Sequence, residues 1–212
     1  VGPHASEGTD AISPRQSAVS PGFDLVGGRA EALKIDPANR YLWHYQTRRL
    51  DAELIRDALL AVGGNLDLSM YGPSILDNTP RRSIYLRVKR SELLPIMTMF
   101  DAPEPTQSIG ERVSTTVPTQ ALAMMNSPFV RQQAEKLAAR IRPTDDIPLG
   151  TAVENAYRTT FSRPPTDSER ERMLAFIESQ RVAMGQTPDA AKRALVEFCQ
   201  IVLCLNEFVY ID

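Results

Sequence analysis

Histidine and cysteine are scarce in this sequence, with two of each among 212 residues. Neither His4 nor His44 has a second histidine or a cysteine at the spacing of a metal-ligand pair, so no zinc site is expected on them. Cys199 and Cys204 lie five apart on one expected helix, about 140° around its axis, which disfavours a disulfide between them. We interpret both as small buried apolar residues and expect no metal and no cofactor.

Several familiar functional signatures are also missing. The sequence has no phosphate-binding Gly-x-x-x-x-Gly-Lys-Ser/Thr loop and no Gly-x-Ser-x-Gly nucleophile elbow. No apolar run approaches the roughly 18 residues of a membrane span. The net charge of −2 gives no basic footprint for nucleic acid, and the five cations within Arg81–Arg90 are more typical of a solvated strand face. We therefore expect neither a nucleic-acid partner nor a membrane span.

Helix-start and helix-stop residues are plentiful. Leu50–Val62 has one apolar face and ends at Gly63-Gly64, while Glu53 and Arg56 have the spacing of a surface ion pair. Further helices are predicted from Asp36-Pro37, Ser91 to Phe100, Pro118 to Met125, Ser127-Pro128 to Ile141, Val153 to Phe161, the Thr166/Glu169 capping box onward, and Thr187-Pro188 almost to the C-terminus. The last three are expected to form an antiparallel bundle.

One stretch has the alternation of a β-strand. Ile84, Leu86 and Val88 fall on one side of an extended 81–90 segment, and residues 113–117 are the best β-branched partner nearby. The predicted fold class is therefore mainly α, a helical bundle with a small two-stranded β ribbon. We expect residues 1–35 to be an irregular segment and 36–212 to be one helical domain, divisible into a core half (36–129) and a C-terminal helical bundle (130–212).

A set of short motifs resembles a known family. These pieces are Asp36–Arg40, Arg48–Glu53, Ile55–Ala58, Gly72–Ser74, Arg81–Tyr85, Phe100–Pro103, Thr116–Leu122, Met125–Phe129 and Asn206–Phe208. In this order they are similar to the DUF1553 family, also called PSD1, a domain of uncharacterised function from planctomycetes and related bacteria. Family members often have a cysteine after Phe-Asp-Ala-Pro, where this chain has Ser108-Ile109-Gly110, so a thiol role there is not expected.

The resemblance implies a domain context. Members are typically the C-terminal part of large exported proteins that also carry a DUF1549 domain and often a cytochrome c-like domain. By this resemblance the chain is an excised C-terminal module of a periplasmic or cell-surface protein. Its expected partners are then the upstream DUF1549 or cytochrome c-like domain of the same polypeptide, and possible extracellular polymers.

Two functional hypotheses follow. The first is a non-catalytic module that docks a neighbouring domain or an extracellular partner, since every strong catalytic motif is absent. The second is an enzyme acting on a polymer such as a polysaccharide, through polar residues from the family motifs: Asp101, Asp51, Arg49, Arg56, Arg112 and Gln120. Clustering of these side chains in an open cleft would favour the enzyme, and burial as mutually satisfied pairs would favour a structural role.

Overall fold

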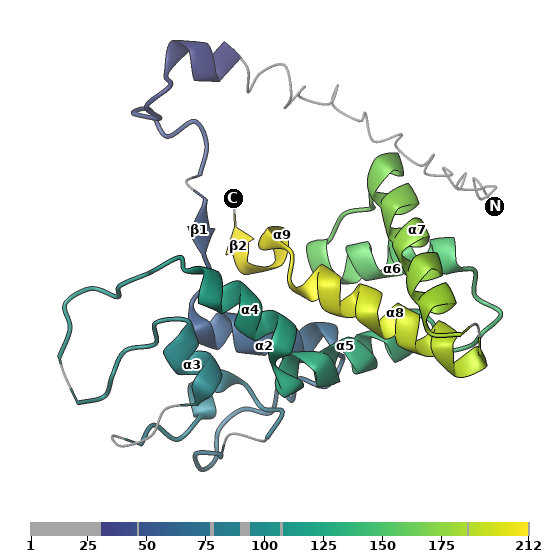
Figure 1. Ribbon diagram of the computed structural model, residues 1–212. Coiled ribbons are helices and arrows are strands. Elements are labelled where there is room, and N and C mark those ends of the chain that lie inside the picture. Colours follow the sequence, from purple (N-terminus) through teal and green to yellow (C-terminus); the bar gives the residue numbers. More distant parts are fainter. Residues whose placement is uncertain are drawn as a thin grey trace, which may run out of the picture. The chain divides into compact units, whose positions relative to one another are not determined.

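The computed structural model describes residues 31–45, 47–76, 79–89, 94–106, 108–185 and 187–211 (Figure 1). The chain divides into two units, Val1–Tyr45 and Gln46–Asp212. In the first, residues 31–35 are helical and Asp36 N–H donates to Ala32 O at 2.8 Å. The Asp36 carboxylate accepts from Tyr41 N–H at 2.8 Å. The helix predicted to begin at Asp36 is therefore wrong, because Asp36 ends a helix and organises the turns that follow.

The second unit is mainly helical, which confirms the predicted fold class. Its elements in chain order are β1 (Arg48–Arg49), α2 (Ala52–Val62), the 3₁₀ helix η1 (Ser83–Tyr85), α3 (Pro95–Met99), α4 (Pro118–Asn126), α5 (Pro128–Ile141), α6 (Leu149–Phe161), α7 (Asp167–Ala183), α8 (Pro188–Leu203), α9 (Asn206–Val209) and β2 (Tyr210–Ile211). Helix α8 packs along both α5 and α7, while α2 packs on α3 and α5 (Figure 1).

Side-chain caps start the helices where the sequence predicts them. Ser127 Oγ accepts from Val130 N–H, and Thr187 Oγ1 accepts from Ala190 N–H at 3.1 Å. Thr166 and Glu169 form the expected reciprocal capping box. The Glu169 carboxylate also accepts two hydrogen bonds from Arg163, and these lower its pKa to about 2. The start of α7 is thus held by an ionised glutamate through most of the acid range.

One continuous core joins α2 to the α5–α8 helices. Its fully buried side chains include Ile55 and Leu59 of α2, Leu137 of α5, Tyr157 of α6 and Phe198 of α8. Burying such a side chain stabilises the fold by about 1.5–3 kcal/mol. Because α2 shares this core with the later helices, its position is fixed, and so is the position of the residues that contact it.

The β ribbon lies elsewhere than the sequence predicts. Antiparallel β1 and β2 pair Arg48 with Ile211 and Arg49 with Tyr210. The described residues 81–89 do not form the predicted strand: η1 interrupts the stretch, and isolated bridges join Asp67 to Arg81 and Ile75 to Leu86. Residues 113–117 are not part of a described strand either. The alternation failed as a strand signal because Ile84 and Val88 are solvent-exposed rather than core residues.

Candidate functional site

Asp101 lies directly after α3, where the chain turns through a left-handed backbone conformation with φ of 57°. Its carboxylate accepts hydrogen bonds from Thr115 N–H at 2.8 Å, from Thr115 Oγ1 at 2.9 Å, and from Arg49 Nη2 at 2.9 Å. Both ends of the loop that connects α3 to α4 are therefore held at one carboxylate. That loop extends away from the helices (Figure 1).

Arg49 brings β1 to the same place. Its side chain is 4% exposed, and its guanidinium also donates to Thr115 O at 2.5 Å and to Phe100 O at 3.0 Å. The Nε of Arg49 is buried without a hydrogen-bond partner. A buried guanidinium with three engaged contacts cannot be withdrawn without removing hydrogen bonds from two carbonyls and a carboxylate. Arg49 thus acts as a fixed crosslink between β1, α3 and the loop.

The pKa of Asp101 reflects this setting. Burial raises it, but the hydrogen bonds from Thr115 and Arg49 outweigh burial and hold the Asp101 pKa below its ordinary value. Asp101 is therefore ionised at neutral pH. A carboxylate in this state can accept a proton or stabilise positive charge, but it cannot serve as a general acid.

Arg112, from the extended loop, reaches the start of α2. Its two Nη atoms donate to the two carboxylate oxygens of Glu53, both at 2.8 Å, and Nη1 lies 3.5 Å from the Asp51 carboxylate. The hydrogen bonds from Arg112 are the main cause that lowers the pKa of Glu53. The prediction that Glu53 pairs with Arg56 is wrong, because the Glu53 carboxylate pairs with Arg112 of the loop between α3 and α4.

Gln120 is buried at the start of α4 with both ends of its amide engaged. Its Oε1 accepts from Val117 N–H at 3.3 Å, and its Nε2 donates to Met99 O at 3.0 Å. The side chain therefore ties the first turn of α4 to the end of α3. This arrangement is typical of a structural amide.

Four of the six candidate residues converge. Arg49, Asp51, Asp101 and Arg112 line one hollow of about 340 Å³. Gln120 lines a separate hollow of about 340 Å³, which shares Arg49 as part of its wall. These side chains do lie around one hollow, but most of them are already engaged in ion pairs or hydrogen bonds with one another or with neighbouring residues. The Asp51 side chain is the most open of the four, at 57% exposed.

Sequence reasoning placed Arg56 in the enzyme hypothesis, but the structure gives it another environment. Arg56 is 2% exposed and donates to Thr79 O at 2.7 Å, Arg81 O at 2.9 Å and Ser83 Oγ at 3.2 Å. The neighbouring Asp57 carboxylate accepts from Ser83 N–H at 2.8 Å. Helix α2 thereby fixes the backbone that surrounds η1.

Arg81 fixes the other part of this irregular stretch. It is buried and donates to Ser69 O, Tyr71 O and Pro73 O, and its guanidinium lies 3.8 Å from the centroid of the Tyr85 ring. The interpretation of Arg81 as part of a solvated cationic face is therefore wrong. No sequence signal separates it from Arg82, since both are arginines in the same short run.

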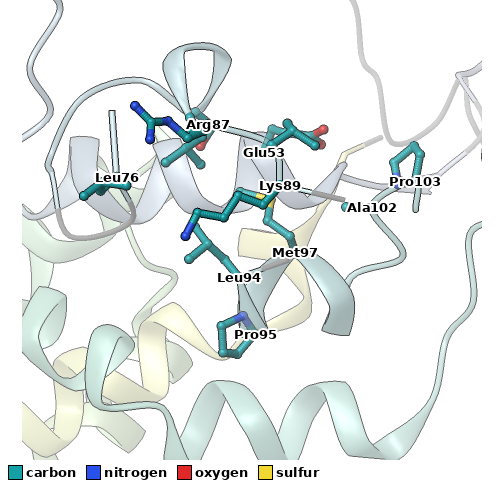
Figure 2. Close-up of a pocket in the computed structure, with 12 residues that line it drawn as sticks. Glu53, Leu76, Arg87, Lys89, Leu94, Pro95, Met97, Ala102 and Pro103 are labelled. Atoms are coloured by element: carbon teal, nitrogen blue, oxygen red, sulfur yellow. The ribbon is translucent and has the colours of Figure 1, made fainter. Parts of the chain in front are cut away.

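We call the described part of residues 65–89 the docking segment, after the role that we propose for it below. Although it is held by buried arginines, it presents large apolar side chains to solvent: Leu68, Met70, Tyr71, Leu76, Ile84 and Val88. Beside it lies a hollow of about 410 Å³, which we call the apolar hollow (Figure 2). Leu76 and Val88 belong to both features.

Within the described ranges, no group of three or more His, Cys, Asp or Glu side chains could hold a metal ion. Among those same residues, no helix is both long enough and apolar enough to cross a bilayer. Burial raises the pKa of Cys199 beyond the usual range and that of Cys204 to about 11, so both are unreactive thiols at neutral pH. Cys199 is buried, as interpreted, whereas Cys204 is only partly buried.

No curated protein and no solved structure matches the chain. A family model described as PSD1, protein of unknown function (DUF1553), matches residues 25–177. This range includes β1, α2 and the docking segment, together with the Asp101 cluster, and it ends within α7. Since the model covers more than half of the sequence, the chain belongs to the PSD1 (DUF1553) family.

Proposed function

We propose that this chain is a non-catalytic helical module that docks against a neighbouring domain or an extracellular partner. The observation that carries the proposal is the docking segment, an irregular stretch that is internally fixed yet exposes large apolar side chains. Exposed apolar surface of this kind marks interaction sites in soluble proteins. Tyr71 and Ile84 are 78% and 75% exposed, so neither contributes to the core of this unit.

The fixation of the segment supports the same proposal. Arg56 and Arg81 together donate to backbone carbonyls of Ser69, Tyr71, Thr79 and Arg81. Transfer of a guanidinium from water into the protein interior costs desolvation free energy. A loop whose carbonyls are hydrated by solvent needs no buried guanidinium to satisfy them. A surface that is rigid before it binds loses less conformational entropy on association. The buried arginines therefore serve to preorganise an apolar surface.

The family suggests which partner to test. By resemblance to PSD1 proteins, the partner is an upstream DUF1549 or cytochrome c-like domain of the same exported polypeptide. A domain joined through the same polypeptide has a high effective concentration, so even a weak contact would be occupied. We therefore expect the isolated interaction to have a Kd of roughly tens of micromolar.

The test is a calorimetric titration of this chain with the upstream domain. The double variant Leu68→Ser/Ile84→Ser is expected to weaken binding at least tenfold, because each large apolar side chain contributes up to about 1.5–3 kcal/mol when buried. The matched control is Val182→Ser, which replaces a 52% exposed residue of α7 and is expected to leave the affinity unchanged. Equal affinity of the double variant and the wild type would contradict this docking surface.

An enzyme acting on a polymer such as a polysaccharide is the second candidate, and one observation favours it. Asp51 and Asp101 line the same hollow, and two carboxylates are the usual equipment of glycoside hydrolysis. Asp51→Asn is expected to lower a measured hydrolysis rate by about 10²-fold or more, with no change in Tm. If the wild type releases no reducing ends from a polysaccharide panel, this candidate has no support.

A further inference from the structure

Two hollows lie on either side of the ion pair between Arg112 and Glu53. The apolar hollow has Glu53 in its wall (Figure 2), and the hollow of about 340 Å³ that Asp101 and Arg112 line, which we call the carboxylate hollow, lies next to it. Asp101 lines the carboxylate hollow, and its neighbour Ala102 lines the apolar hollow. On α2, Glu53 lines the apolar hollow and Leu54 lines the carboxylate hollow. Because Arg112 and Glu53 are hydrogen-bonded, their side chains form a wall between the two hollows.

The contact that forms this wall is open to solvent. The Arg112 and Glu53 side chains are 42% and 34% exposed. Their mutual hydrogen bonds raise the pKa of Arg112 and lower the pKa of Glu53, so both groups are charged at neutral pH. An ion pair between exposed side chains is weakened by salt and contributes little net stability. The wall therefore depends on a contact that opens at small cost.

Residues 108–114, which we call the strap, carry Arg112. All of them are exposed, and a Cβ atom on Gly110 would meet no atom within 4 Å beyond its chain neighbours. Within the described ranges, Arg112 is the one strap residue with a hydrogen bond to another part of the chain. Directly after the strap, Thr115 N–H donates to the Asp101 carboxylate at 2.8 Å. In the part of the chain that the structure describes, the strap thus has a fixed base at Thr115 and one side-chain attachment, at Arg112.

We propose that the Arg112–Glu53 pair is a gate. While the pair is formed, the strap separates the two hollows; when the pair breaks, the strap moves about Thr115 and the hollows join into one continuous groove. Asp51 favours this movement, because its carboxylate lies 3.5 Å from Arg112 Nη1, its side chain is 57% exposed, and it does not cap α2. Arg112 can therefore leave Glu53 while keeping a counter-charge. The inference goes beyond docking, since it concerns access to the Asp101 cluster and not the surface of the docking segment.

The first test follows the strap by electron paramagnetic resonance. Gly110→Cys provides a labelling site with room for a nitroxide, and both native thiols have raised pKa values and react slowly at neutral pH. Arg112→Met in the labelled protein is expected to increase the mobile spectral component about threefold, and the labelled parent should approach the same spectrum in about 1 M NaCl. The matched control Arg158→Met removes an exposed pair with Glu154 of α6 and should leave the spectrum unchanged. An unchanged spectrum in Arg112→Met or in high salt would overturn the gate.

Two truncations at the start of α2 identify the partner of Arg112. Glu53→Ala and Asp51→Ala each remove one carboxylate, and the Asp51 side chain makes no capping hydrogen bond to α2. Glu53→Ala is expected to mobilise the label as Arg112→Met does. Asp51→Ala should leave the mobility unchanged or lower it, because Arg112 then loses its second position. Equal mobilisation by both truncations would show a general charge effect and refute the gate, and the salt titration of the labelled parent gives the same readout if a variant does not fold.

Dye binding tests whether the hollows join. Arg112→Met and Glu53→Ala both open the wall but change the net charge in opposite directions, so a gain shared by both variants does not come from charge. The probes are the fluorescent dye ANS, which a hollow of this size accepts, and bis-ANS, in which two such dyes are linked. Both variants are expected to bind bis-ANS about fivefold more tightly than the wild type, with the ANS affinity changed less than about twofold. Equal changes for the two dyes, or no change for either, would refute the joined groove.

Discussion

Replacement of Arg56 by methionine is expected to lower the free energy of unfolding by about 3–5 kcal/mol. The methionine retains the apolar stem but removes the guanidinium, which donates hydrogen bonds to Thr79 O, Arg81 O and Ser83 Oγ. Hydrogen bonds from a charged donor contribute roughly 1.5–3 kcal/mol each, and the recovered desolvation energy offsets part of that loss. The effect should be local first, because the orphaned carbonyls belong to the docking segment.

Denaturant unfolding and amide hydrogen exchange measure the two parts of this expectation. The amides of Asp67, Ile75 and Arg87, which are bonded within the docking segment, should exchange much faster in the variant. Exchange of the α8 amides should change only as far as the global free energy of unfolding changes. As a control, Arg158→Met removes an exposed pair with Glu154 and is expected to change stability by less than about 0.5 kcal/mol. A loss below 1 kcal/mol for Arg56→Met would show that the segment does not depend on Arg56.

Asp101→Ala is expected to destabilise the protein by about 3–5 kcal/mol, because it leaves the buried Arg49 guanidinium without its counter-charge. Alanine is also a poor occupant of the left-handed conformation at this position. Asparagine tolerates that conformation and retains the side-chain shape, so Asp101→Asn should lose only about 1–2 kcal/mol. Comparable losses for the two variants would mean that charge pairing with Arg49 contributes little.

The pH dependence of Asp101→Asn provides a second readout. The Asp101 pKa is lowered in the folded state, so its carboxylate contributes stability above the unfolded pKa of about 3.9. That contribution is lost as the pH falls through the lower, folded-state pKa. The difference between wild type and Asp101→Asn, measured by urea unfolding, should be constant above about pH 5 and shrink below about pH 4. A difference that persists unchanged to pH 3 would argue against a lowered pKa of Asp101 in the folded state.

The sequence predicts the helices well because their signals are local. Ser127, Thr166 and Thr187 begin helices through contacts made three residues away, and Gly63-Gly64 ends α2 as expected. The last helix shows the limit of the method: its apolar stripe continues, yet α8 ends at Leu203 and a separate α9 follows. An apolar stripe reports which side chains are buried, but it does not report a break in the backbone.

Contacts between distant residues were less accessible. The β1–β2 ribbon pairs two strands that lie near the first and last residues of the unit in sequence. Each strand has two residues, which is too short for any periodic signal. Spacing alone could not bring Arg49 to Asp101 or Arg112 to Glu53. The family motifs grouped Arg49, Asp101 and Arg112 as candidates, but Glu53 was not among those candidates. Family motifs group residues that matter to the domain, but they do not separate a catalytic cluster from a structural one.

The β1–β2 ribbon has a further consequence for how the unit is attached. Because Arg48 pairs with Ile211, the chain enters and leaves this unit at the same edge. A polypeptide joined at either strand would tether the unit at this one edge. Such a tether limits the distance between the unit and a partner but not their relative orientation, which is then set by the noncovalent surface that the unit presents.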